Sequence, residues 1–298
     1  MDFKQLESFV AIAKLKSFSR AAEDLYLTQP TISNHIHILE KELSTILFNR
    51  TNKNITLTDA GEILYEHAIS ILNKKEHAYF SLNEFKGKIQ GILEISSSSI
   101  PEQYYLSDLI CQFSKKFPDV NFSLLRYDSK KVIDKILSGE IDFGLVGAKD
   151  TSTQIDYIEI LDDEIVLIAP NNTNFNKLST ITIDNFKPYP LIFREDGSGT
   201  RKVVLSYLDS VNVKLTNLNI ISEVEDNETI KKLVINGLGL SFISSRAIKN
   251  ELQLGLLKEI RIESLNMNRK FYFAFHKKRV LSPLSETFKD FIINSTSL

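Results

Sequence analysis

The sequence predicts a chain of the α plus α/β class: a winged helix-turn-helix, then a long helix, then a two-lobed α/β region. Three observations support this prediction. Apolar residues recur at steps of three and four over residues 1–57, and an apolar heptad without proline continues to about residue 88. Short apolar strands then alternate with amphipathic stretches over the rest of the chain. A length of 298 residues suits two or three compact domains.

Composition and charge exclude several classes of protein. Hydrophobic residues make up 43% and charged residues 25%, which is ordinary for a globular chain and excludes wholesale disorder. The net charge of −2 argues against coating nucleic acid by bulk charge. A single cysteine, Cys111, cannot form an internal disulfide. The N-terminus has no secretory pattern and no apolar run approaches ~20 residues, so we expect a cytoplasmic protein without membrane contact.

The first region is expected to contain a helix-turn-helix. Its first helix has an apolar stripe of Phe3, Leu6, Phe9, Val10 and Ala13. Ser17 or Ser19 can cap a second helix, and Thr28 can cap a third, which has Pro30 in its first turn. Residues 25–28 leave room only for a tight turn between the second and third helices. The buried face of the third helix is predicted to be Ile32, Ile36, Leu39 and Leu43.

The opposite face of this third helix is suited to reading DNA, because Gln and Asn can bind adenine through two hydrogen bonds. It carries Gln29, Pro30, Ser33, Asn34, His37 and Lys41. Residues 48–54 hold two cations and three amides, a composition that suits a wing along the DNA backbone. We therefore assign DNA contacts to Ser17, Arg20, Gln29, Pro30, Thr31, Ser33, Asn34, His37, Arg50 and Lys53.

This region allows two other interpretations, of which the first stays open and the second is rejected. A helical hairpin with a solvated polar face is the alternative, and the acids Glu40 and Glu42 favour it. A metal site at His35 and His37 is not expected, because two residues apart on a helix lie on opposite faces.

Residues 58–88 predict one long helix. Its heptad core positions are Leu64, Ala68, Ile71, Ala78, Leu82 and Phe85, with Lys75 as the polar exception. Such a stripe would not be stable if exposed, so we expect the helix to pair with a second chain. The alternative is that it packs on its own protein.

The region after Lys88 is expected to form a mostly parallel sheet in two lobes. Its strands are predicted at Ile92–Ile95, Phe122–Leu125, Phe143–Val146, Ile165–Ala169, Leu191–Phe193, Leu218–Val224 and Leu240–Ile243. The three acids 162–164 could be paired catalytic groups, but a solvated crossover is the favoured interpretation. Neither a phosphate-binding P-loop nor a nucleophile–base pair is present in the sequence, so we expect no catalytic residue, metal or cofactor.

Two loops of this region favour a small anion. Residues 95–103 and 193–202 each follow a strand and precede a helix, where hydroxyls and free backbone N–H groups gather. Ligands sit beyond the carboxyl ends of parallel strands, so the two loops should face one cleft. This argument selects Gly147, Arg194, Ser198, Gly199, Thr200 and Asn227. The alternatives are that the serines only cap a helix and that Gly-Ser-Gly is only a turn.

Several motifs carry a family resemblance. Phe18-Ser-Arg-Ala-Ala-Glu-Asp-Leu25, Thr28-Gln-Pro-Thr-Ile-Ser33, Leu39-Glu40, Leu47-Phe48-Asn-Arg50 and Leu57-Thr-Asp-Ala-Gly61 resemble the winged helix-turn-helix of LysR-type transcriptional regulators. The rest of the chain is similar to the dimerisation helix and effector domain of that family, which has the fold of a type 2 periplasmic binding protein. The chain departs from the family at Asn34, His35 and His37, where Arg, Gln and Arg are frequent.

Within the family, the chain resembles the branch that contains regulators of cysteine biosynthesis and selenium metabolism. This resemblance implies a small anionic effector, related to sulfur or selenium, in loops matched here by Ser97, Ser98, Ser99, Gln103, Gly147 and Thr200. It also implies domains at residues 1–58, 59–88 and 89–298. The last of these divides into one lobe of 89–162 with 267–298 and another of 163–266.

The expected function is therefore transcription regulation by an effector-controlled DNA-binding protein, not an enzyme. Its expected partners are double-stranded DNA with an interrupted palindromic operator, a small anion, a second copy in a homodimer or homotetramer, and RNA polymerase. Two rivals share the two-lobed region: a solute-binding protein, which would need export, and an α/β enzyme acting on a small anionic ligand.

Overall fold

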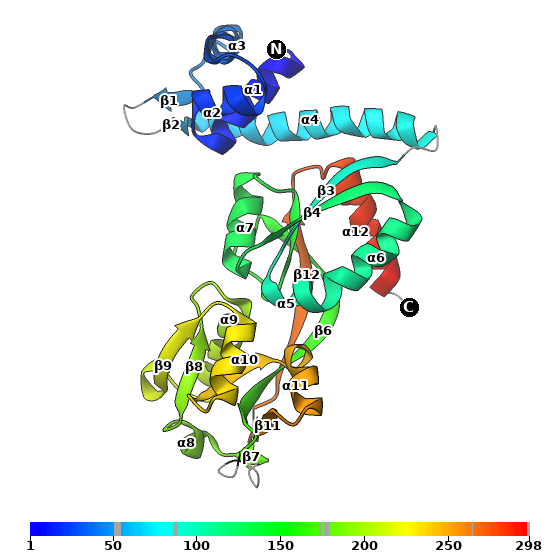
Figure 1. Cartoon of the computed structure of the whole chain (residues 1–298). Coiled ribbons are helices and arrows are strands. Elements are labelled where there is room, and N and C mark those ends of the chain that lie inside the picture. Colours follow the sequence, from blue (N-terminus) through cyan, green and yellow to red (C-terminus); the bar gives the residue numbers. More distant parts are fainter. Residues whose placement is uncertain (51–54, 86–88, 173–174, 176–178, 264, 297–298) are drawn as a thin grey trace.

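The computed structural model describes residues 1–50, 55–85, 89–172, 175, 179–263 and 265–296. Figure 1 shows a small helical domain at the N-terminus, a long helix beneath it, and two α/β lobes stacked below that helix. Among these described residues, no helix is long and apolar enough to cross a membrane.

The N-terminal domain is a winged helix-turn-helix. Its elements are α1 (Phe3–Leu15), α2 (Phe18–Asp24), α3 (Gln29–Glu42), β1 (Phe48–Arg50) and β2 (Ile55–Leu57), the two strands pairing antiparallel. Ser17, not Ser19, caps α2, and Thr28 caps α3 as expected. Phe3 and Leu43 are exposed, contrary to prediction, because they stand at helix ends beyond the three-helix contact. The core is formed by Leu6, Phe9, Ile12, Ala21, Ile32, Ile36 and Leu39.

Helix α4 (Asp59–Phe85) follows, and its N-terminus is held against the wing. The Thr58 hydroxyl accepts a hydrogen bond from the backbone N–H of Gly61 at 3.0 Å. A Cβ at Gly61 would lie 2.2 Å from the Leu47 carbonyl oxygen, so this position needs a glycine.

The two halves of α4 differ in their surroundings. In the first half, Ala68 is buried and Tyr65 donates its hydroxyl to the Ser138 carbonyl oxygen of the lobe below at 2.8 Å. In the second half, Tyr79 and Leu82 are exposed. The predicted polar position Lys75 donates to Glu7 on α1 at 2.7 Å. His77 also contacts its own chain, at the Leu281 carbonyl oxygen at 2.7 Å. The alternative of packing on its own chain therefore applies to the first half and to Lys75 and His77, whereas the apolar residues Tyr79 and Leu82 have no such cover among the described residues.

The α/β region has its strands in one mixed sheet. The strands are β3 (Gln90–Ser97), β4 (Asp119–Arg126), β5 (Phe143–Val146), β6 (Ile155–Pro170), β7 (Thr180–Ile181), β8 (Pro190–Arg194), β9 (Asn219–Val224), β10 (Leu240–Ser244), β11 (Leu257–Ile262) and β12 (Met267–His276). The helices are α5 (Ser99–Pro101), α6 (Ser107–Lys116), α7 (Ser129–Ser138), α8 (Ile183–Phe186), α9 (Gly199–Ser210), α10 (Asn227–Ile235), α11 (Lys249–Gln253) and α12 (Pro283–Thr296).

The expectation of a mostly parallel sheet holds within each lobe but not between them. Strands β3, β4 and β5 are parallel neighbours in the first lobe, as are β8, β9 and β10 in the second. Strands β6 and β12 pass from one lobe into the other as a long antiparallel pair. We call this pair the hinge strands (Figure 1). The chain must cross twice, in opposite directions, and this makes the sheet mixed.

The acids 162–164 lie within β6, and the prediction of a solvated crossover is wrong for one of them. Strand alternation leaves Asp162 and Glu164 exposed and turns Asp163 inward, where its side chain is fully buried between the lobes.

Candidate functional site

The exposed face of α3 presents the side chains that the sequence assigned to DNA contact. Gln29, Pro30, Asn34 and His37 are exposed, and Thr31 and Ser33 are half-buried. Thr28 fixes the start of this helix, since its hydroxyl accepts the backbone N–H of Thr31 at 3.4 Å. The polar face is therefore presented by a capped helix, as recognition in a major groove requires.

Two further assigned residues support the geometry of α2. The Ser17 hydroxyl accepts the Arg20 backbone N–H at 3.2 Å, and the Arg20 guanidinium donates to the Leu15 carbonyl oxygen at 2.6 Å. The Arg50 side chain and Lys53 lie outside the described part of the chain.

The acids that favoured a merely solvated hairpin have partners inside the domain. Glu40 accepts the backbone N–H of Leu47 at 2.9 Å, and Glu42 pairs with the N-terminal ammonium of Met1. His35 lies 2.7 Å from the buried Ser8 hydroxyl, so it braces α3 against α1. Among the described residues, no group of three or more His, Cys, Asp or Glu side chains is placed to hold a metal ion.

The second candidate site lies where the two lobes meet. A small space of about 20 Å³, which we call the inner cavity, is bordered by loops from both lobes. Seven of the predicted effector residues line it: Ser98, Ser99, Gly147, Arg194, Ser198, Gly199 and Thr200. Its other lining residues are Ile100, Asp128, Ser129, Glu195, Arg269 and Phe271. Ile100 and Glu195 lie in the two loops that the sequence indicated, and the other four were not predicted.

Three predicted effector residues do not line the inner cavity. Ser97 donates its hydroxyl to the neighbouring Ser98 carbonyl oxygen. Asn227 stands behind the cavity, where its amide donates to Ser99 of the other lobe at 3.2 Å. Gln103 lies in a π-helical turn between α5 and α6, and its Oε1 is buried without a hydrogen-bond partner among the described residues.

The two arginines at the inner cavity differ in how their donors are used. Arg194 is neutralised by its neighbour, since Nε and Nη2 both donate to Glu195 and Nη1 donates to Asn227 at 2.7 Å. Arg269 donates Nε to Asp163 at 2.7 Å and Nη1 to Thr200 at 3.0 Å. Burial lowers the pKa of Arg269, and the Asp163 carboxylate opposes that effect.

Arg269 was not predicted, because it contacts Thr200, which lies 69 residues earlier in the sequence, only once the hinge strands have paired. A signal was present in the alternation of its strand. Met267, Phe271 and Phe273 are buried at every second position, and Arg269 occupies the same inward series. A charge in an otherwise apolar series is the feature that could have identified it.

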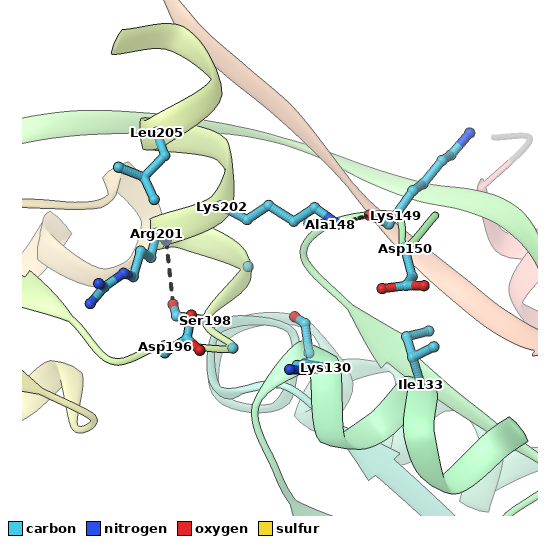
Figure 2. Close-up of a pocket in the computed structure, with 13 residues that line it drawn as sticks. Lys130, Ile133, Ala148, Lys149, Asp150, Asp196, Ser198, Arg201, Lys202 and Leu205 are labelled. Atoms are coloured by element: carbon cyan, nitrogen blue, oxygen red, sulfur yellow. Dashed lines mark hydrogen bonds between the residues drawn. The ribbon is translucent and has the colours of Figure 1, made fainter. Parts of the chain in front are cut away.

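A larger space, the outer cavity, adjoins the inner one and measures about 210 Å³. Figure 2 shows it between α7 and the start of α9. It shares Ser129, Ser198 and Gly199 with the inner cavity and adds Ile133, Ala148 and Leu205 as apolar lining. Figure 2 also shows the Lys149 ammonium turned away from this space, and it lies 4.8 Å from the centre of the Tyr272 ring.

Contacts between the lobes hold the cleft closed. Lys202 of α9 donates to the Lys149 carbonyl oxygen at 2.7 Å, and the Lys130 backbone N–H donates to the Gly197 carbonyl oxygen at 3.3 Å. A Cβ at Gly199 would lie 2.8 Å from the Ser129 hydroxyl, so glycine permits this approach.

A capped recognition helix with a wing, joined to two lobes that close over a hydroxyl-lined cavity, defines a ligand-responsive DNA-binding protein. Comparison with known families agrees. Residues 3–62 match the bacterial regulatory helix-turn-helix protein, lysR family, and residues 86–297 match the LysR substrate binding domain. The chain belongs to the LysR family of transcriptional regulators.

Relatives of similar length include RuBisCO regulators and the regulator CysL. A probable RuBisCO transcriptional regulator from Cyanidium caldarium is 31% identical, over 95% of this chain and 90% of that protein. The HTH-type transcriptional regulator CysL from Bacillus subtilis (strain 168) is 30% identical, over 97% and 94%. The chain is thus similar to CysL, and it is equally similar to the RuBisCO regulators.

Solved structures share the fold. A cysteine variant of full-length OxyR from Pseudomonas aeruginosa aligns with a TM-score of 0.74 at 21% identity, covering 100% of this chain and 95% of that one. The regulatory domain of Synechocystis PCC6803 CcmR in complex with 2-PG aligns with a TM-score of 0.63 at 26% identity, covering 70% and 98%.

Proposed function

We propose that this regulator binds an operator through α3 and the wing, and that a small anion held between the lobes changes that binding. The observation that supports this most directly is the inner cavity, where hydroxyls, the start of α9 and a buried guanidinium meet. Hydroxyl and N–H donors at a helix start favour an anion.

The DNA contacts in this proposal are those of the exposed face of α3, with Ser17, Arg20, Arg50 and Lys53 along the backbone. Two copies pair through the second half of α4, where Ala78, Tyr79 and Leu82 are exposed. Pairing would place two recognition helices on successive major grooves of an interrupted palindrome. Assembly to a homotetramer and contact with RNA polymerase extend the same proposal.

The proposed effector is either a compound of sulfur or selenium metabolism or an acid similar to 2-PG. Two likenesses support this range: the similarity to CysL and the similarity to a CcmR domain that was solved with 2-PG. Binding would bias the closure of the lobes, and it can shift DNA affinity only by its differential affinity for the two states.

The proposal includes a division of labour along the chain. Residues 1–58 bind DNA, residues 59–88 dimerise, and residues 89–298 bind the effector without catalysing a reaction on it. The protein would act in the cytoplasm, where its operator is accessible.

A gel shift with the DNA just upstream of its own gene tests the proposal. We expect a specific complex that survives scrambled competitor DNA and changes in mobility or affinity with sulfate, thiosulfate, selenite, O-acetylserine or 2-PG. A complex that responds to none of these compounds would exclude the effectors proposed above. Absence of specific binding, both to this DNA and in a selection from random duplex DNA, would contradict the proposal that the protein regulates transcription by binding an operator.

A further inference from the structure

Arg269, on one hinge strand, is held in one orientation by partners from two other segments. Its side chain is 3% exposed, and it is fixed by Asp163 on the other hinge strand and by Thr200 at the start of α9. Asp163 also accepts the Ser244 hydroxyl at 2.6 Å. Because both hinge strands and the second lobe contribute to this arrangement, the guanidinium cannot swing away without disturbing all three.

The charge at this point is not cancelled. The Asp163 carboxylate lies 2.7 Å from Arg269 Nε and 3.7 Å from Arg246 Nε, so one negative charge is shared by two guanidiniums. Arg194, the other arginine at the inner cavity, is fully engaged by Glu195 and Asn227. Asp128, the remaining acid at the inner cavity, pairs with Lys131 at 3.1 Å. Of the two arginines there, Arg269 is therefore the one that has no carboxylate to itself.

One donor of Arg269 is unused. Its Nη2 is buried and has no hydrogen-bond partner among the described residues, although Nε and Nη1 are both satisfied. A buried N–H group without an acceptor is costly and is rarely left so. Arg269 lines the inner cavity and also two wider surface spaces, and only the inner cavity is bordered by the effector loops of both lobes. It is therefore the place where a bound effector would bring an acceptor to this group.

The size of the two cavities limits what can supply that acceptor. The inner cavity, about 20 Å³, has room for little more than one polar group. The adjoining outer cavity of about 210 Å³ is somewhat larger than the roughly 150 Å³ that holds a benzene molecule. Ile133, Ala148 and Leu205 give this cavity an apolar part that suits carbon. The rest of its lining is polar or charged and includes Lys130, Lys149, Asp150, Asp196, Arg201 and Lys202.

We propose that Arg269 binds the acidic group of an organic effector through its free Nη2, with Thr200 and Asp163 as the residues that position it. The carbon body of that effector, about six to ten non-hydrogen atoms, occupies the outer cavity. This inference rests on the proposed function and narrows its effector to an organic acid, excluding free sulfate, phosphate or selenite as the physiological ligand.

The test is isothermal titration of the full-length protein with 2-PG, shikimate, O-acetylserine, sulfate and phosphate. We expect at least one of the three organic acids to bind at least about tenfold more tightly than either inorganic ion. We expect the double variant Arg269→Gln/Asp163→Asn to weaken that binding by at least about tenfold. The double variant removes both members of the buried ion pair, so that neither charge is left unpaired and the protein can still fold for the binding measurement.

Arg246→Gln is the matched control, since Arg246 approaches the same carboxylate but does not line the inner cavity. It should bind the acid within about twofold of wild type. Three results would overturn the proposal: tighter binding of sulfate or phosphate, wild-type affinity in the double variant, or no binding of any organic acid below about 10 mM. If the gel shift persists in those cases, only this inference fails; loss of specific DNA binding by the unmodified protein would remove the proposed function instead.

Discussion

The helix-turn-helix and the ligand cleft position their functional side chains in opposite ways. The proposed DNA-reading face lies on one helix of 14 residues, and its side chains are exposed or half-buried. The cleft collects side chains from segments between Ser98 and Phe271, and most of them are buried. The difference teaches that local signals such as caps and periodicity specify the first site, whereas strand pairing over long separations specifies the second.

The largest effect is expected where the cleft depends on a pairing between distant strands. Asp163→Ala would leave the buried Arg269 without its carboxylate. Breaking a buried ion pair in this way should cost about 3–5 kcal/mol of unfolding free energy. Denaturant unfolding measures it, with Asp162→Ala as the control, because Asp162 is exposed on the same strand. A loss for Asp163→Ala no greater than for the control would refute the buried-pair account.

The second-largest effect is expected from a methyl group added where the two lobes meet. Gly199→Ala would place a Cβ 2.8 Å from the Ser129 hydroxyl and 3.0 Å from the Gly147 backbone. We expect a cost of about 1–3 kcal/mol and weaker acid binding, because the lobes can no longer meet. Specific DNA binding should be retained in the gel shift. Ser210→Ala, on the exposed end of the same helix, should change neither property.

Two helix caps of equal geometry allow a direct comparison of the two regions. Thr28 caps α3 and Ser198 caps α9, each accepting a backbone N–H at 3.4 Å. Replacing either with Ala should cost about 1 kcal/mol. Thr28→Ala should lower DNA affinity only, and Ser198→Ala should lower acid affinity only. Equal loss of both affinities in either variant would show that the regions do not act separately.

The same contrast between local and long-range features explains which parts of the structure could be predicted from the sequence. Thr28, Pro30 and the buried Ile32 and Ile36 are local features, and the helix formed where they indicated. Arg269 was missed because its role depends on the pairing of two strands that are distant in sequence. Asp163 was misread for the same reason, since three consecutive acids resemble a loop until the strand turns one of them inward.

The smallest effect is a pH dependence of stability. His276 is buried at the end of β12, and burial lowers its pKa below the ordinary value of 6.5. Below that ordinary value the unfolded chain binds a proton that the folded chain resists, so stability should fall as the pH drops below about 6.5. His276→Gln should flatten this slope in thermal unfolding scans at constant salt. An unchanged slope would mean that other groups cause it.

The central claim is that DNA reading and ligand sensing belong to separate regions. The most direct test is to measure operator binding by gel shift and acid binding by calorimetry on Asn34→Ala and Thr200→Val. We predict that Asn34→Ala loses operator affinity and binds the acid normally, because Asn34 is exposed on α3. Thr200→Val should bind the operator normally and lose the response to the acid, because it removes the acceptor that orients Arg269. Loss of both activities from either single substitution would contradict the account.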